Sequence, residues 1–119
     1  MDKIKPNDGY VYLIGDSNDN VKVGHSISVA SRLRSLRTGN IGIKLVAAIR
    51  TDQCILLESF LHEHLKEYHV NGEWYKGINS VTSKVIEYIK KHGEIFKAFD
   101  IYFPAPDKPM STLRIRDSK

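Results

Sequence analysis

Four residues spread over the first half of the chain have side chains suited to phosphodiester hydrolysis: Tyr12, Lys22, Arg32 and Glu58. That reaction needs a deprotonated water, neutralisation of the charge that builds on the phosphate, and help for the leaving oxygen. Tyr12 is the candidate general base, and Lys22 is a cation that could activate it. Arg32 suits the phosphate oxygens, because its planar fork fits them better than an ammonium does. Glu58 is the candidate metal ligand, for Mg²⁺ (or Mn²⁺), which needs only one or two protein carboxylates.

A histidine accompanies the glutamate. His62 follows Glu58 by four residues, a spacing that brings both heads to one site on a helix. His62 is therefore a further candidate catalytic residue, as a proton donor or a metal contact, with simple pairing to Glu58 as the alternative. Taken singly, each of these residue types also has a common structural role on a strand or a helix surface. The functional interpretation depends on the set and its order along the chain.

The elements that would position these side chains begin with a hairpin. Residues 10–14 and 21–24 are rich in β-branched and aromatic side chains, and a turn-rich segment separates them. If Val21 and Val23 join the core side chains of the first strand, Lys22 and Tyr12 share the opposite face. A third strand is predicted at about 44–50. We expect a small, mainly antiparallel three-stranded sheet.

Helices are predicted between and after these strands. Ser28 is a plausible N-cap for a helix to about Arg37. The clearest apolar stripe predicts a helix over about 52–68 that carries Glu58 and His62. Another helix is expected from about Asn79 or Ser80 to His92-Gly93, because glycine commonly ends helices. Residues 94–103 are apolar and compatible with helix or strand.

Length and composition favour one domain of the α/β class, α+β type, with helices flanking the sheet. The chain has 119 residues, of which 41% are hydrophobic and 27% charged. Cys54 is the only cysteine, which excludes an internal disulfide and a cysteine-rich zinc cluster. No apolar run approaches the roughly 18 residues of a membrane span, and no signal-peptide core is visible. The expectation is a cytoplasmic protein without membrane contact.

Positive charge is concentrated in the first half of the chain. Residues 1–50 carry eight Lys and Arg against four Asp, within a net charge of +4. Such an excess favours a polyanionic partner, although solvated surface charge is an equally common reason for it. The candidate nucleic-acid-binding residues are Arg34, Arg37, Lys44, Arg114 and Arg116. Residues 104–119 contain prolines and alternating charges, which predict a basic extended tail after a domain of residues 1–103.

The order and spacing of these motifs resemble the GIY-YIG endonuclease superfamily over about residues 9–92. Tyr10-Val11-Tyr12 matches the first motif of that family, and Lys22-Val23-Gly24 matches the second. Arg32 matches its helical arginine, and Glu58 its metal-binding glutamate. The chain is most similar to a phage-associated DNA-binding branch with a Val-Lys-Ile-Gly second motif, a Glu-x-x-x-His helix and a Gly-Glu-Trp-Phe segment. The last of these reads here as residues 72–75.

Two positions depart from the family pattern. Tyr10 stands where the first motif has glycine, and Lys22 stands where the second has tyrosine. The resemblance implies a metal-dependent DNA endonuclease, and a lysine at the second position occurs in some active members. The alternative is a non-catalytic DNA-binding module with the same fold. A structural or protein-interaction domain is the third interpretation, and the sequence leaves the oligomeric state undetermined.

Overall fold

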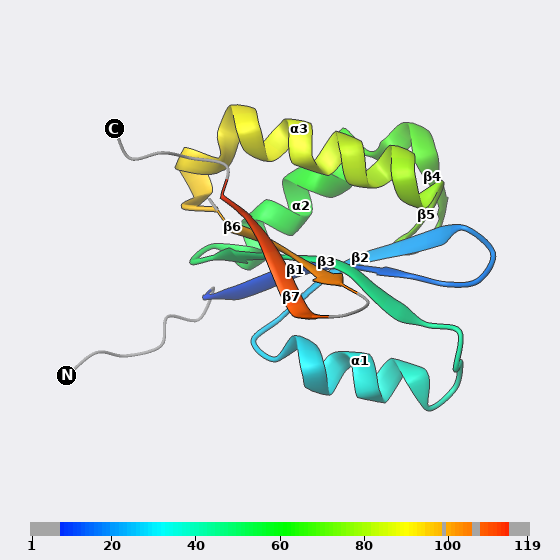
Figure 1. Ribbon diagram of the computed structural model, residues 1–119. Coiled ribbons are helices and arrows are strands. Elements are labelled where there is room, and N and C mark those ends of the chain that lie inside the picture. Colours follow the sequence, from blue (N-terminus) through cyan, green and yellow to red (C-terminus); the bar gives the residue numbers. More distant parts are fainter. Residues whose placement is uncertain (1–7, 99, 106–107, 115–119) are drawn as a thin grey trace.

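The computed structural model describes residues 8–98, 100–105 and 108–114, with side chains up to residue 104. Its elements in chain order are β1 Gly9–Gly15, β2 Asn20–Ser26, α1 Val29–Arg37, β3 Lys44–Thr51, α2 Cys54–His64, the 3₁₀ turn η1 Lys66–Tyr68, β4 His69–Asn71, β5 Trp74–Lys76, α3 Ile78–Phe96, β6 Asp100–Ala105 and β7 Lys108–Arg114 (Figure 1). No helix of the described part combines the length and the apolar character that crossing a bilayer requires.

The prediction of a three-stranded sheet is wrong. One sheet of seven strands runs in the order β4-β5-β2-β1-β3-β6-β7, and all its pairings are antiparallel. The three predicted strands are its centre. The α+β class and the single domain agree with the structure. The four added strands lie at the two sides of the sheet, where β4 and β5 have only three residues each and show no alternating pattern that could reveal them.

The assumed hairpin register is confirmed. Leu13 lies opposite Val23, and Ile14 lies opposite Lys22. Because paired residues point to the same side of a sheet, Lys22 and Tyr12 share a face. That face is covered by α1, whereas α2 and α3 cover the other (Figure 1). The larger core lies under α2 and α3, and a smaller one of Tyr12, Ile14 and Ile43 lies under α1.

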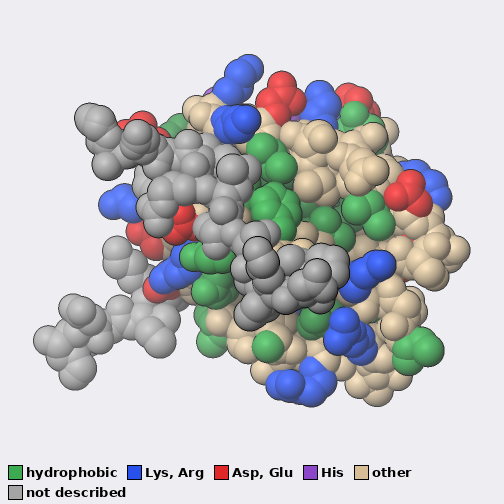
Figure 2. Space-filling model, viewed as in Figure 1, with side chains coloured by type: hydrophobic (Ala, Val, Ile, Leu, Met, Phe, Trp, Pro, Cys, Tyr) green, Lys and Arg blue, Asp and Glu red, His purple; other side chains and the backbone are tan. Residues whose placement is uncertain are grey.

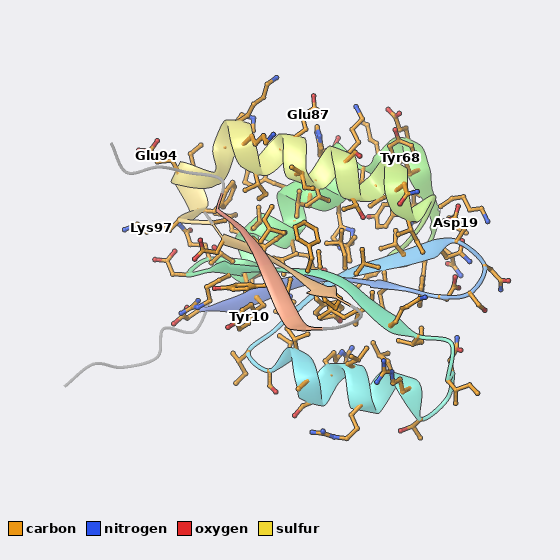
Figure 3. The ribbon with its side chains drawn as sticks, viewed as in Figure 1. Tyr10, Asp19, Tyr68, Glu87, Glu94 and Lys97 are labelled. Atoms are coloured by element: carbon orange, nitrogen blue, oxygen red, sulfur yellow. The ribbon has the colours of Figure 1, made fainter. Side chains whose placement is uncertain are left out.

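The helices differ from their predicted ranges mainly at their C-terminal ends. Helix α1 begins as expected, with the Ser28 hydroxyl accepting the Ser31 amide at 3.3 Å. Helix α2 ends at His64, and η1 completes the predicted segment. The predicted end of α3 at Gly93 is wrong, since the helix continues to Phe96 and ends at Lys97, which has a φ of 53° (Figure 3).

Gly93 is needed for close packing within the helix. An added Cβ there would lie 2.5 Å from the carbonyl oxygen of Ala98, where the chain turns back against α3. The sequence rule for glycine as a helix end therefore fails, because this glycine serves a contact with a later segment.

The segment expected as a tail enters the sheet in part. Residues 104 and 105 complete β6, and residues 108–114 form β7, paired with β6 from Asp100 opposite Arg114 to Ala105 opposite Lys108. Residues 115–119, with Arg116, lie outside the described residues. The division into residues 1–103 and 104–119 stays a prediction.

Candidate active site at the edge of strand β2

Tyr12 is held by the strand opposite it. It lies in β1 directly across from Gly24 of β2, and its side chain is almost wholly buried, with 1% exposed. A Cβ added to Gly24 would lie 2.4 Å from the Tyr12 hydroxyl oxygen. The second motif thus ends in glycine because the ring of Tyr12 occupies the space that a side chain would need.

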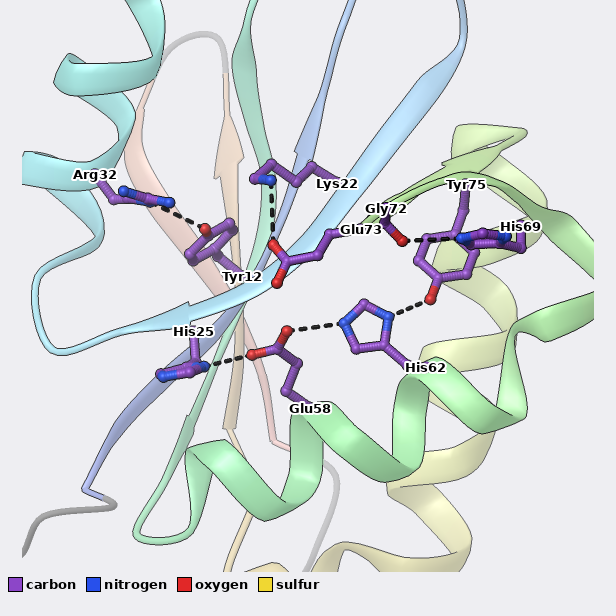
Figure 4. Close-up of polar contacts among 10 residues, drawn as sticks. All are labelled: Tyr12, Lys22, His25, Arg32, Glu58, His62, His69, Gly72, Glu73 and Tyr75. Atoms are coloured by element: carbon purple, nitrogen blue, oxygen red, sulfur yellow. Dashed lines mark hydrogen bonds and ion pairs between the residues drawn. The ribbon is translucent and has the colours of Figure 1, made fainter.

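Arg32 contacts the Tyr12 hydroxyl from α1. Its Nε donates a hydrogen bond to that oxygen at 3.2 Å (Figure 4). This hydrogen bond and the nearby phenol oxygen raise the pKa of Arg32 above its ordinary value, so it stays a cation at all working pH. Residue Arg32 is exposed, which leaves its guanidinium accessible to a ligand. The structure brings together the predicted base and the predicted phosphate contact.

Lys22 takes a different partner. Its Nζ lies 3.1 Å from a carboxylate oxygen of Glu73 and 5.7 Å from the centre of the Trp74 ring. Only 15% of its side chain is exposed, against 44% for Glu73. The hydroxyl of Tyr12 accepts a hydrogen bond from Arg32, so the cation placed on the predicted base is the arginine. Lys22 instead fixes the carboxylate of Glu73 beside the site.

Glu58 is the centre of a hydrogen-bonded network rather than a solvated flank. It is buried on α2, and its two oxygens contact His25 Nδ1 and His62 Nε2, the latter at 2.8 Å (Figure 4). Burial, the largest single influence, raises the pKa of Glu58, but the two histidines together hold it below its ordinary value. Glu58 is therefore an anion, and both ring nitrogens must donate to it because a carboxylate only accepts.

Tyr75 extends the network on the far side of His62. Its hydroxyl contacts His62 Nδ1, and its ring is buried under α2. Burial, with the charges of Glu58 and Glu73, raises the pKa of Tyr75 to about 12, so it remains a phenol and donates to that nitrogen. In the neutral ring without a metal, the proton of His62 then sits on Nε2, directed at Glu58. To ligate a metal through Nε2, the ring would carry its proton on Nδ1 instead, with the Tyr75 hydroxyl oxygen as the acceptor.

Three donor groups at this site can hold a metal ion. Glu58, His62 and Glu73 each place one ligand atom so that all three lie within 4.8 Å of one another. Two carboxylates and an imidazole suit divalent transition metals and, with added water, Mg²⁺. The predicted metal ligand, Glu58, belongs to this set, and so does the predicted catalytic His62.

The whole site wraps around one edge of β2. Strand β5 pairs with β2 only at residues 20–22, and the Glu73 carbonyl then accepts the amide of Val23. Beyond that point the side of β2 carries no further strand among the described pairings. Tyr12, Lys22 and Arg32 approach this edge from the α1 face, and Glu58 and His62 approach it from the α2 face (Figure 4). Glu73 lies between the two groups.

The expected phosphate-binding residues are placed on or beside α1 where the structure describes them. Arg34, Arg37 and Lys44 are exposed. On the side of the molecule drawn in Figure 2, Lys and Arg side chains lie over the end that α1 forms. Arg37 also donates from Nε to the Ile43 carbonyl at 3.0 Å. The backbone of Arg114 lies at the end of β7, while its side chain and all of Arg116 lie outside the described residues.

Sequence reasoning missed four residues of this site. Gly24 ends the second motif without an assigned site role, and His25 follows it in the same strand, so their place in and next to that motif was the available signal. Glu73 and Tyr75 lie in the segment 72–75, which the resemblance included without assigning a site role. Their contacts join β4, β5 and α2, which no local pattern could bring together.

Comparison with known proteins assigns most of the chain to one family. Residues 9–97 match the family model described as the T5orf172 domain, and this range includes every site residue described above. No curated protein and no solved structure matches the chain.

Proposed function

The chain belongs to the T5orf172 domain family, a phage-associated family linked to endonuclease folds, and on that premise we propose that it is a metal-dependent DNA endonuclease of GIY-YIG type. The observation that carries the proposal is the meeting of two groups at the edge of β2. A tyrosine hydroxyl contacted by arginine lies on one face, and an ionised, buried glutamate with histidine and a second carboxylate lies on the other.

The metal's donor set is supported by the positions of the ligand atoms. Glu58, His62 and Glu73 would hold the ion, since their ligand atoms already lie close enough to converge with small side-chain movements. A bound Mg²⁺ or Mn²⁺ would offset charge on the phosphate and the leaving oxygen.

The chain's own residues divide the remaining work. Arg32, exposed at the start of α1, binds the non-bridging oxygens and sets the phosphate next to the Tyr12 hydroxyl. Tyr12 acts as the base: its hydroxyl first gives up its own proton to solvent and then accepts the proton of the attacking water, beside the Arg32 cation. Lys22 pairs with Glu73 until the metal takes this carboxylate, and Tyr75 fixes the ring of His62 as a positioning residue.

The test is nicking of supercoiled plasmid in Mg²⁺ or Mn²⁺, with and without chelator. Wild type is expected to nick only with metal. Glu58→Gln, which keeps the shape of the side chain, is expected to lower the rate by about 10²-fold or more while plasmid affinity persists. Glu63→Gln is the matched control, because Glu63 is exposed on the same helix and pairs with Lys66 outside the site.

The burial of Tyr12 favours a second candidate, a DNA-binding module without turnover. With 1% of its surface exposed, Tyr12 can act as a base only if substrate and water reach its hydroxyl beside Arg32. Wild type that binds plasmid but leaves it intact in both metals would establish this second function and reject the first. Nicking by Glu58→Gln at the wild-type rate would reject the assigned site.

A further inference from the structure

An apolar groove of about 330 Å³ lies beside the candidate site, on the same face of the sheet. Three neighbouring strands contribute Tyr10, Ala48 and Tyr102, and the first turn of α1 forms the opposite wall. Ile27, at the rim, has 71% of its surface exposed. The groove has the size at which proteins begin to enclose small organic groups.

Aromatic rings line the groove. The Tyr10 and Tyr102 rings pack edge to face, with centroids 6.4 Å apart and an interplanar angle of 65°. Both residues are only partly buried, and the small Ala48 lies across from Tyr102 in the next strand. An edge-to-face pair leaves ring surface available for a further flat group.

The groove adjoins the phosphate-binding side of the site. Ala48 pairs directly with Tyr12 in the sheet, which places their Cβ atoms about 5 Å apart. Val29, in the groove wall, is one helical turn from Arg32. A group in the groove and a phosphate on Arg32 are thus neighbours, at a separation that one nucleotide can span.

Arg32 is the cation beside one end of the groove, and an ion pair of Arg50 with Asp8 lies at the other. The guanidinium of Arg50 lies 5.7 Å from the centre of the Tyr10 ring, on the side away from Arg32. None of the residues that line the groove in the described part is acidic. The nearby Asp8 is engaged by Arg50 in an ion pair.

We propose that this groove binds an unstacked nucleobase next to the phosphate contacted by Arg32, a specificity that rests on the proposed action on DNA. The base stacks on Tyr10 or Tyr102, while Arg32 contacts the adjoining phosphate at one end of the groove. Flat aromatic faces flanked by arginines are the usual recognition elements for single-stranded nucleic acid.

The experiment compares two single-stranded ligands of equal length, about ten nucleotides, in the presence of chelator. One is an oligothymidylate, and the other is a fully abasic deoxyribose phosphate chain. Wild type is expected to bind the first about tenfold more tightly, since each stacked base contributes substantially to affinity. Equal affinities would overturn the proposal, and so would failure to bind either ligand.

Variants locate the base. Tyr102→Ala is expected to weaken oligothymidylate binding about tenfold and leave abasic binding unchanged, and Tyr102→Phe is expected to behave as wild type. Ala30→Leu fills the groove from an exposed helix position, so it is also expected to weaken oligothymidylate binding and leave abasic binding unchanged. It tests the groove independently if Tyr102→Ala fails to fold. Phe60→Ala is the control, an exposed aromatic on α2 across the sheet.

Equal weakening of both ligands by Tyr102→Ala and Ala30→Leu would overturn the proposal. Because these measurements use no metal and record no cleavage, they are separate from the nicking assay. A chain that fails to nick plasmid but prefers the ligand with bases would retain the groove and lose the proposed catalysis.

Discussion

At the scale of single residues, the site depends on a space as much as on side chains. The Tyr12 ring can lie across β2 only because Gly24 has no Cβ. Arg32 then meets the hydroxyl from the helix that follows. A glycine in a strand normally weakens it, so its presence here is best understood through the ring that it admits.

Gly24→Ala is expected to displace the Tyr12 hydroxyl and lower nicking at least about tenfold, because a contact of 2.4 Å cannot persist. Overpacking should also reduce the free energy of unfolding by about 1–3 kcal/mol. Plasmid nicking and chemical denaturation measure the two effects. Gly39→Ala is the matched control, since an added Cβ there meets nothing within 4 Å. Undiminished nicking by Gly24→Ala would remove Tyr12 from the mechanism.

Lys22→Met is expected to tighten binding of Mn²⁺ several-fold. The substitution removes the cation that lies 3.1 Å from the Glu73 carboxylate and competes with a divalent ion for it. Glu73→Gln is expected to weaken Mn²⁺ binding. Titration calorimetry measures both, with Lys66→Met as control, because that lysine pairs with Glu63 on the exposed side of the same region. If neither Lys22→Met nor Glu73→Gln changes the affinity, Glu73 is not a ligand.

At the scale of elements, α1 and α2 supply complementary parts of the site from opposite faces. Helix α1 carries exposed arginines, whereas α2 carries a buried anion held by ring nitrogens. The short β4 and β5 link them, because their connection brings Glu73 to the open side of β2. Neither helix alone contains a complete site.

Arg34→Gln is expected to lower the slope of log affinity against log salt by about 0.9, as the loss of one phosphate contact predicts. Arg34 suits this test because its side chain donates to the exposed Ser31 hydroxyl, at 3.4 Å, on the same helix surface. Arg37 is less suitable, since it also supports the loop before β3. Fluorescence anisotropy with duplex DNA at several salt concentrations gives the slope. Lys90→Gln on α3 is the control. An equal change in slope for this variant would mean that only the net charge of the protein, and not a phosphate contact at Arg34, sets the salt dependence.

At the scale of the whole molecule, the sheet is much wider than the three strands at its centre. Strands β6 and β7 extend it on the side away from the candidate active site, and β6 contributes Tyr102 to the groove. The C-terminal segment is therefore structural as far as Arg114, whatever its charges contribute to binding.

Deleting residues 108–119 is expected to lower the melting temperature by at least about 5 °C, because the backbone of β6 loses its partner strand. Deleting only residues 115–119 leaves β7 in place and serves as the control. The salt slope should fall by about two with the longer deletion and about one with the shorter, if Arg114 and Arg116 both contact phosphate. Equal melting temperatures for the two truncations would contradict the role of β7 in the fold.

Local patterns determined the centre of this protein. Strand-forming residues on either side of a turn-rich segment predicted the hairpin, the Ser28 cap predicted the start of α1, and an apolar stripe predicted α2. The register was assumed from the alternation of core side chains, and the structure confirms it. The order of Tyr12, Lys22, Arg32 and Glu58 indicated a nuclease-like family, and the family match includes all four. The elements depend on residues a few positions apart, and the motif order is read directly along the chain, so the sequence alone contains both.

Only the tertiary structure decided the partners within the site and the width of the sheet. Lys22 pairs with Glu73 and not with the predicted base, and Glu58 is buried against His25, because each contact joins segments far apart in the chain. Gly93 continues a helix for the same reason, since its role depends on Ala98 packing against it. Strands of three residues and side strands gain their stability from neighbours rather than from local propensity, so no local pattern could predict them.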